Sequence, residues 1–149
     1  MPQSIAYNYS HITFSTKDRY PFIDEEIQNE LFQYIGGICK NMDFKPVIVG
    51  GYNHIHILCV LSRKVALMKL IEEVKAHSSK WMKTKGEKYK NFYWQRGYGS
   101  FSVNPAEIDV VIRYIENQSE HHKKKTFQEE YLAFLKKYKV EYDERYLWD

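Results

Sequence analysis

The run KPVIVGGYNHIHILCVL, residues 45–61, has the pattern of two β-strands joined by a tight turn. Its two halves, Lys45–Gly51 and His54–Leu61, are rich in β-branched and other apolar residues, which is typical of strands. Residues 50–53, Gly-Gly-Tyr-Asn, are residue types that form turns between paired strands. The run therefore predicts a β-hairpin whose second, more apolar strand lies near the centre of a sheet.

Strands and helices are also predicted on both sides of this hairpin. Residues 7–16 alternate apolar and polar side chains and predict a first strand, and an apolar stripe at helical spacing follows over residues 24–42. After the hairpin, residues 65–85 predict a long helix. The aromatic run 91–103 predicts a further strand, with a bulge or a close backbone approach at residues 97–99.

Two capping patterns mark helices near the C-terminus. Asn104-Pro105-Ala106-Glu107 predicts a helix from 105 to about 122, and Thr126-Phe127-Gln128-Glu129 predicts one from there to about 139. The order β-α-β-β-α-β followed by two helices indicates an α+β fold of the ferredoxin-like, split βαβ type. We expect one domain, residues 1–149, with an antiparallel sheet that carries helices on one face and leaves the other open.

Length and composition exclude several classes of protein. A chain of 149 residues with 44% hydrophobic and 28% charged residues is neither disordered nor fibrous. No apolar run reaches the 18 or so residues of a membrane span, and the N-terminus lacks the features of a signal peptide, so we expect a cytoplasmic protein. Cys39 and Cys59 are expected to be free thiols in apolar surroundings. The unusual feature is the aromatic content of 16%, with 13 tyrosines.

Basic residues are concentrated in the middle of the chain. Residues 61–125 carry 14 basic and 7 acidic side chains, whereas the segments on either side each carry 4 basic and 6 acidic ones. Such a distribution fits a groove for a polyanion such as nucleic acid. It also fits a solvated, lysine-rich helix, and charge alone does not separate the two interpretations.

Two histidines and a tyrosine carry the candidate chemistry. His54 and His56 are two residues apart on a predicted strand, so both imidazoles leave the same face and form half of a metal site. On the predicted helix 105–122, Tyr114 and Gln118 are four residues apart and share a face. A tyrosine beside a metal can be a nucleophile, because a cation lowers the phenol pKa from about 10. Tyr114 can equally be a residue of the apolar helix face.

Taken together, three motifs resemble a known protein family. His54-Ile55-His56, the run from Tyr114 to Gln118 and the aromatic block from Trp94 to Gly99 are similar in kind and order to motifs of the small single-tyrosine transposases of bacterial insertion sequences. These are the TnpA-type members of the HUH superfamily. The resemblance runs nearly end to end, from His11 to Trp148. One departure is Asn53, which stands where many relatives carry an acidic residue.

The resemblance implies a strand transferase for single-stranded DNA. It implies that His54, His56 and Gln118 bind a divalent cation, Mg²⁺ or Mn²⁺, and that Tyr114 attacks the scissile phosphate to give a 5′-phosphotyrosine and a free 3′-OH. Family members are homodimers that recognise DNA hairpins, and the tyrosine helix of one subunit can complete the histidine site of the other. No nucleotide cofactor is expected, because the sequence has no Walker motif.

Basic and aromatic residues outside these motifs are candidates for DNA contacts through phosphate attraction and base stacking. They are Lys69, Lys80, Lys83, Arg96, Tyr98, Lys123 and Lys124. Two alternatives stay open: a non-catalytic module that binds single-stranded nucleic acid, and a domesticated relative that processes repeated chromosomal hairpins.

Overall fold

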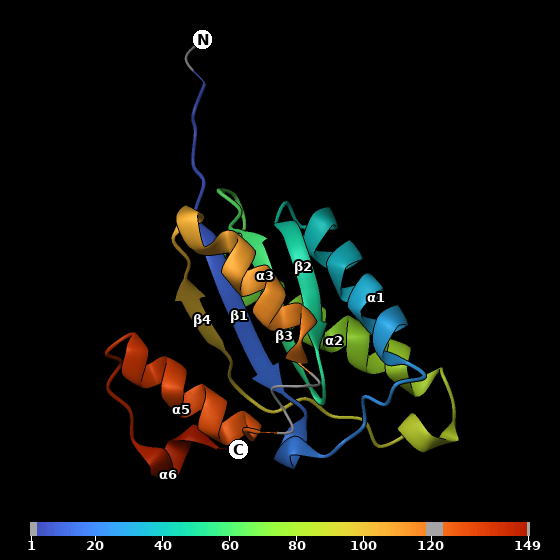
Figure 1. Ribbon diagram of the computed structural model, residues 1–149. Helices are drawn as coiled ribbons and strands as arrows, with labels where there is room; N and C mark the ends of the chain where they lie inside the picture. The colour runs from blue at the N-terminus through green and yellow to red at the C-terminus, as the bar shows by residue number, and fades with distance from the viewer. Residues whose placement is uncertain (1–2, 119–123, 149) are drawn as a thin grey trace.

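The computed structural model describes residues 3–118 and 124–148. Within these residues, four antiparallel strands form a sheet in the order β2-β3-β1-β4 (Figure 1). The strands are β1 (Tyr9–Ser15), β2 (Lys45–Gly51), β3 (His54–Val60) and β4 (Gly99–Ser102). Because β3 separates β1 from β2, and β1 separates β3 from β4, both βαβ units are split. The ferredoxin-like α+β prediction is confirmed.

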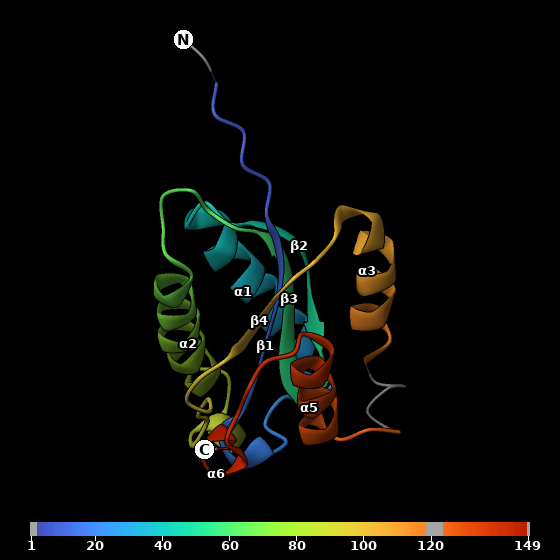
Figure 2. The same ribbon diagram turned by 90° about the vertical axis from the view of Figure 1, so that its left-hand side faces the viewer.

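The main hydrophobic core lies between the sheet and two long helices, α1 (Gln28–Asn41) and α2 (Leu67–Lys83). Figure 2 shows both helices on the same face of the sheet. Alternation along β1 and β3 directs every second side chain into this core. The fully buried members include Ile12, Phe14, Leu31, Ile35, Ile55, Ile57, Leu70 and Val74.

The second face of the sheet is covered, contrary to the expectation of an open face. Helices α3 (Ile108–Glu116) and α5 (Phe127–Lys137) lie there, opposite α1 and α2 (Figure 2). Two glycines allow this close packing. A Cβ atom on Gly50 would lie 2.7 Å from the side chain of Ile115 in α3, and one on Gly99 would lie 2.7 Å from the ring of Tyr131 in α5. The predicted close approach around residues 97–99 is therefore present.

The last strand is shorter than predicted. Regular pairing covers β4 alone, and of residues 91–98 only Trp94 forms a β-bridge, to Thr16. The Gln95 N–H still donates to the carbonyl oxygen of Ser15 in β1 at 3.0 Å. Lys75 Nζ donates hydrogen bonds to the carbonyl oxygens of Gln95 at 2.8 Å and Gly97 at 2.6 Å. Gly97 has a positive φ of 76°, which interrupts the extended backbone.

Both predicted helix starts near the C-terminus are present. The chain enters α3 through a 3₁₀ turn, Pro105–Glu107, in which the Asn104 side chain accepts a hydrogen bond from the Ala106 N–H. The predicted end of this helix at 122 lies outside the described residues. Thr126 and Glu129 form a reciprocal capping box at the start of α5, and a short helix α6 (Glu144–Leu147) follows.

Two further expectations concern the two cysteines and the presence of a membrane-spanning helix. Cys39 and Cys59 are buried free thiols, and burial raises their pKa values to about 11 and about 12. Among residues 3–118 and 124–148, no helix is long and apolar enough to span a membrane.

A candidate metal centre beside a tyrosine

His54 and His56 project from β3 toward α3 and α5, because the residues between and after them, Ile55 and Ile57, fill the main core. Both histidines are almost fully buried, with 1% and 0% of their surface exposed. Their Nε2 atoms lie 3.0 Å apart. Two ligands each about 2.1 Å from one ion, at a right angle, are separated by about 3.0 Å, so the spacing matches adjacent positions around a single cation.

A carboxylate from α5 completes a triangle with the two imidazoles. Glu130 Oε1 lies 3.1 Å from His54 Nε2 and 2.9 Å from His56 Nε2. Glu130 is itself buried, with 7% of its surface exposed. His54, His56 and Glu130 thus form a group that could hold a metal ion.

The Nδ1 atom of each imidazole, which faces away from the triangle, also has a polar partner. Asn53 Oδ1 lies 3.0 Å from His54 Nδ1, and His11 Nε2 lies 2.7 Å from His56 Nδ1. An amide oxygen accepts only, so a proton on His54 Nδ1 would be donated to Asn53, and with a cation bound the lone pair of Nε2 would face the triangle. A proton donated from His56 Nδ1 to His11 does the same for His56. Three electron-pair donors then converge on one point, an arrangement that a cation stabilises.

Gln118 contributes a further oxygen to this region. It follows the last turn of α3 and is 1% exposed, with Nε2 3.4 Å from Glu130 Oε2. Within the described part of the chain, its buried Oε1 has no hydrogen-bond partner. A buried amide oxygen without a partner is costly unless an ion or water satisfies it, so this oxygen fits a further ligand of a metal ion.

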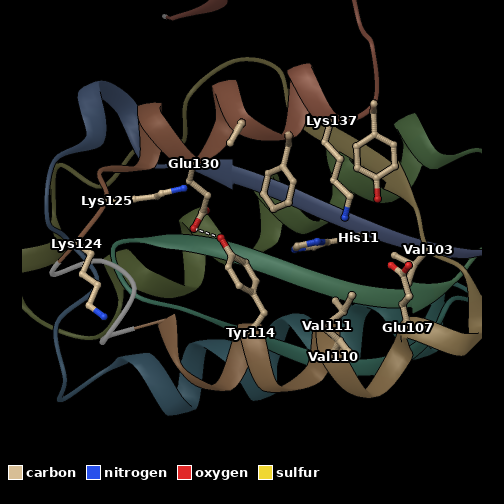
Figure 3. A pocket seen from close by; sticks show the side chains of 13 residues that line it. His11, Val103, Glu107, Val110, Val111, Tyr114, Lys124, Lys125, Glu130 and Lys137 are labelled. Carbon is tan, nitrogen blue, oxygen red and sulfur yellow. Dashed lines mark hydrogen bonds between the residues drawn. The ribbon is translucent and has the colours of Figure 1, made fainter.

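Tyr114 lies at the edge of the same cluster, in the same chain. Its hydroxyl donates a short hydrogen bond to Glu130 Oε2, drawn as a dashed line in Figure 3. Its ring centroid is 5.8 Å from that of His56. Burial, with the charge and the hydrogen bond of Glu130, raises the pKa of Tyr114 above its usual value of 10. Without a cation, the tyrosine is therefore a neutral hydrogen-bond donor.

Burial controls the protonation of the surrounding groups. It lowers the pKa of His11 to about 3, with the neighbouring His56 acting in the same direction, and it also lowers the pKa of His56. For Glu130, burial acts to raise the pKa, but hydrogen bonds and charge from His54 and His56 outweigh it and bring the pKa below the usual range. The carboxylate is thus ionised at neutral pH.

These shifts predict that the metal-free protein loses stability in acid. A histidine whose pKa is lowered by folding binds its proton more readily when unfolded, so falling pH favours the unfolded chain between about 6.5 and the folded value. For His11, the free energy of unfolding should fall by up to about 1.4 kcal/mol per pH unit below pH 6.5. Below about pH 4.5, the lowered pKa of Glu130 acts in the same direction.

Urea unfolding in EDTA at pH 7, 6 and 5 would measure this slope. His11→Asn should reduce it by comparison with the wild type. Equal slopes for the variant and the wild type would contradict the assignment to His11.

The lysines predicted to contact DNA from α2 lie far from this cluster. Lys69, Lys80 and Lys83 belong to a helix on the opposite face of the sheet from α3 (Figure 2). Lys69 Nζ is 3.1 Å from a carboxylate oxygen of Glu73, and Lys83 Nζ donates to Ser79 Oγ at 3.0 Å. Their role in DNA binding stays a prediction, and it requires a surface separate from the tyrosine.

The remaining predicted contacts occupy two other regions. Arg96 and Tyr98 lie in the segment before β4, and Tyr98 packs against the main core. Lys124 lines a cavity beside Tyr114, together with Lys125 (Figure 3). Lys123 lies outside the described residues.

A comparison with known protein families shows to which family this chain belongs. Residues 4–118 match the family described as "Transposase IS200 like". The chain belongs to the IS200-like transposase family. The match covers the sheet, the two histidines, Tyr114 and Gln118, and it ends before α5. Glu130 of this IS200-like transposase therefore comes from a part of the chain that the family match does not include.

Solved structures share the fold. A candidate transposase from Deinococcus radiodurans R1 is 18% identical, with a TM-score of 0.60, and the alignment covers 79% of this chain and 96% of that one. A REP-associated tyrosine transposase bound to a REP hairpin is 14% identical, with a TM-score of 0.58, over 82% of this chain and 72% of that one. No curated protein gives a significant sequence match.

Sequence reasoning did not find Glu130 or the contact of His11 with the histidine pair. A signal for Glu130 was present: Phe127, Glu130, Tyr131 and Phe134 follow helical spacing, which places a carboxylate within an otherwise apolar stripe. For His11, the alternation along β1 indicates only on which face of the strand its side chain lies. Its contact with His56 depends on the pairing of β1 with β3, in which Thr13 lies opposite His56.

Proposed function

We propose that this IS200-like transposase cleaves and rejoins single-stranded DNA at insertion-sequence ends through a 5′-phosphotyrosine on Tyr114. The observation that carries the proposal is the position of Glu130. One of its carboxylate oxygens contacts the Tyr114 hydroxyl, and the other contacts both His54 and His56. A candidate nucleophile and a candidate cation site are thus adjacent within one chain.

The proposed cation is Mg²⁺ or Mn²⁺, held by His54, His56 and Gln118, with Glu130 as an added ligand. When bound, the cation supplies Lewis-acid polarisation of the scissile phosphate. A carboxylate changes the electrostatics from an all-neutral ligand set: it reduces the net charge facing the phosphate and favours hard cations over softer ones.

The protein's own groups define the bond changes. Tyr114 Oη forms a bond to phosphorus while the bond from phosphorus to the 3′ oxygen breaks, which leaves a 3′-OH on the upstream strand and links the downstream 5′ phosphate to the tyrosine. Glu130 Oε2 accepts the hydrogen bond of the phenolic O–H, so it can take the proton of Tyr114 as the bond to phosphorus forms, and the departing 3′ oxygen takes up one proton to become the 3′-OH. Attack of a 3′-OH on the phosphotyrosine reverses the step, and no nucleotide cofactor is needed.

The proposed partners are single-stranded DNA with hairpin ends and a second copy of this chain. Support for the DNA comes from the family and from the related fold that was solved with a REP hairpin. Since Tyr114 contacts Glu130 of its own chain, a homodimer would serve to hold two DNA ends together rather than to supply the tyrosine.

The experiment that tests the proposal is covalent capture. Hairpin oligonucleotides with randomised single-stranded tails, labelled at the 3′ end or at the 5′ end, are incubated with protein and Mn²⁺. A 3′ label should move to a protein band that survives denaturing electrophoresis, and a 5′ label should appear in a shorter free strand. EDTA should prevent both. Binding without cleavage under all conditions would instead favour the non-catalytic binding module.

A further inference from the structure

A cavity of about 440 Å³ lies between α3 and α5, beside the proposed tyrosine nucleophile. Its base is formed by His11 of β1 and by Val103, and Tyr114 and Glu130 lie toward one end (Figure 3). The volume falls within the range of small-molecule sites in proteins. The cavity therefore offers space for a ligand in direct contact with the reacting centre.

Most of the cavity wall is apolar and partly aromatic. The side chains that form it are Val110 and Val111 of α3, Ala133 and Phe134 of α5, and Tyr138, which directly follows α5. Val110 is 57% exposed although it is apolar. The ring of Phe134 packs edge-on against both His11 and Tyr114, at centroid distances of 5.2 Å and 6.1 Å. A flat aromatic ligand would bury this surface.

Positive charge surrounds the apolar wall. Lys124 and Lys125 lie at the end beside Tyr114 and Glu130, and the Lys137 ammonium group points toward His11 (Figure 3). Glu107, at the other end, is the acidic residue of the lining besides Glu130. The cavity thus combines an apolar wall with lysines beside Tyr114 and beside His11. This combination suits a ligand that has both an aromatic ring and phosphate, which is the chemistry of a nucleotide.

We propose that this cavity receives the base of the unpaired nucleotide joined to the phosphate that Tyr114 attacks, while the lysines hold the neighbouring phosphates. The inference rests on the proposed function, which it deepens by specifying how the substrate is chosen. A base can enter a pocket between two helices only when it is unpaired and unstacked. The cavity would therefore select single-stranded DNA over duplex at the cleavage position.

Binding of short probes, measured without metal, tests the cavity independently of cleavage. The four homotrinucleotides, and each of them with an abasic central position, are titrated in EDTA into protein with ¹³C-labelled valine methyl groups. We expect the intact trinucleotides to shift the Val110 and Val111 methyl signals and to leave Val74 of α2, which is buried in the core on the opposite face of the sheet, unchanged. The abasic probes should produce shifts at least about threefold smaller.

A matched pair of variants completes the test. Ala133 and Ala76 are both exposed alanines on helices, but only Ala133 lines the cavity. Ala133→Trp should raise the dissociation constant of the intact trinucleotides at least about tenfold, and Ala76→Trp should not change it. Equal affinities for both variants, or equal shifts with abasic probes, would overturn the inference even if the covalent adduct forms. Loss of probe binding in Ala133→Trp without any adduct in the wild type would overturn only the proposed function.

Discussion

Tyr114→Phe is expected to abolish the covalent protein–DNA adduct, with the rate of adduct formation falling by at least about 10³-fold. The substitution removes one oxygen atom, the atom that would bond to phosphorus, and keeps the ring that packs against His11, His56 and Phe134. Folding and Mn²⁺ binding should therefore change little. Adduct yield on denaturing gels, with circular dichroism as the folding control, measures the effect.

A control for this prediction uses a second tyrosine. Tyr93 is 61% exposed, and its ring packs against Lys83 of α2, the helix on the opposite face of the sheet from α3, so Tyr93→Phe should form the adduct at the wild-type rate. An adduct that persists in Tyr114→Phe would show that another side chain is the nucleophile. Mixing Tyr114→Phe with His56→Ala should restore no activity, because Tyr114 and the histidines belong to the same chain in this arrangement. Restored activity would instead require a tyrosine exchanged between subunits.

Local sequence patterns predicted the parts of this site that depend on regular geometry. The alternation in β3 placed His54 and His56 on one face, since Ile55 and Ile57 must enter the core. The four-residue spacing placed Tyr114 and Gln118 on one side of the helix that follows the split βαβ repeat, and in the structure Gln118 lies just beyond the end of that helix, α3. Strand and helix periods are properties of the backbone, so they can be read without knowledge of the partners.

What the sequence left undetermined depends on contacts between distant segments. Helical spacing in α2 groups its lysines on faces of the helix, but it does not indicate which face of the sheet the helix covers. The structure places α2 across the sheet from Tyr114 (Figure 2). In the same way, the capping box located the start of α5 correctly, yet the docking of α5 over the histidines depends on Gly99, which is too small to obstruct Tyr131.

Glu130→Gln is the second substitution with a large expected effect. The change keeps the size of the side chain and an oxygen, but it removes the negative charge that lies 3.1 Å and 2.9 Å from the two histidine nitrogens. Partners that only orient a metal ligand already alter affinity by about 10–100-fold. A lost carboxylate ligand should therefore lower Mn²⁺ affinity by at least about 100-fold, measured by isothermal titration calorimetry or electron paramagnetic resonance.

The neighbouring residue supplies a close control. Glu129 lies next to Glu130 in the first turn of α5, is exposed, and takes part in the capping box, a position where glutamine also functions. Glu129→Gln should therefore retain both the helix and the Mn²⁺ affinity. If Glu129→Gln weakened binding as much as Glu130→Gln, the effect would come from the charge of the helix terminus and not from a ligand.

Gln118→Ala separates the two ligand sets that remain open. If Glu130 is a ligand, loss of the neutral Gln118 oxygen should weaken Mn²⁺ binding by only about tenfold, because an amide contributes less electrostatic attraction than a carboxylate. The opposite ranking, with affinity lost in Gln118→Ala and kept in Glu130→Gln, would leave the cation to His54, His56 and Gln118. Glu130 would then act on Tyr114 alone, and Glu130→Gln would slow adduct formation at saturating Mn²⁺ without changing the concentration of Mn²⁺ needed.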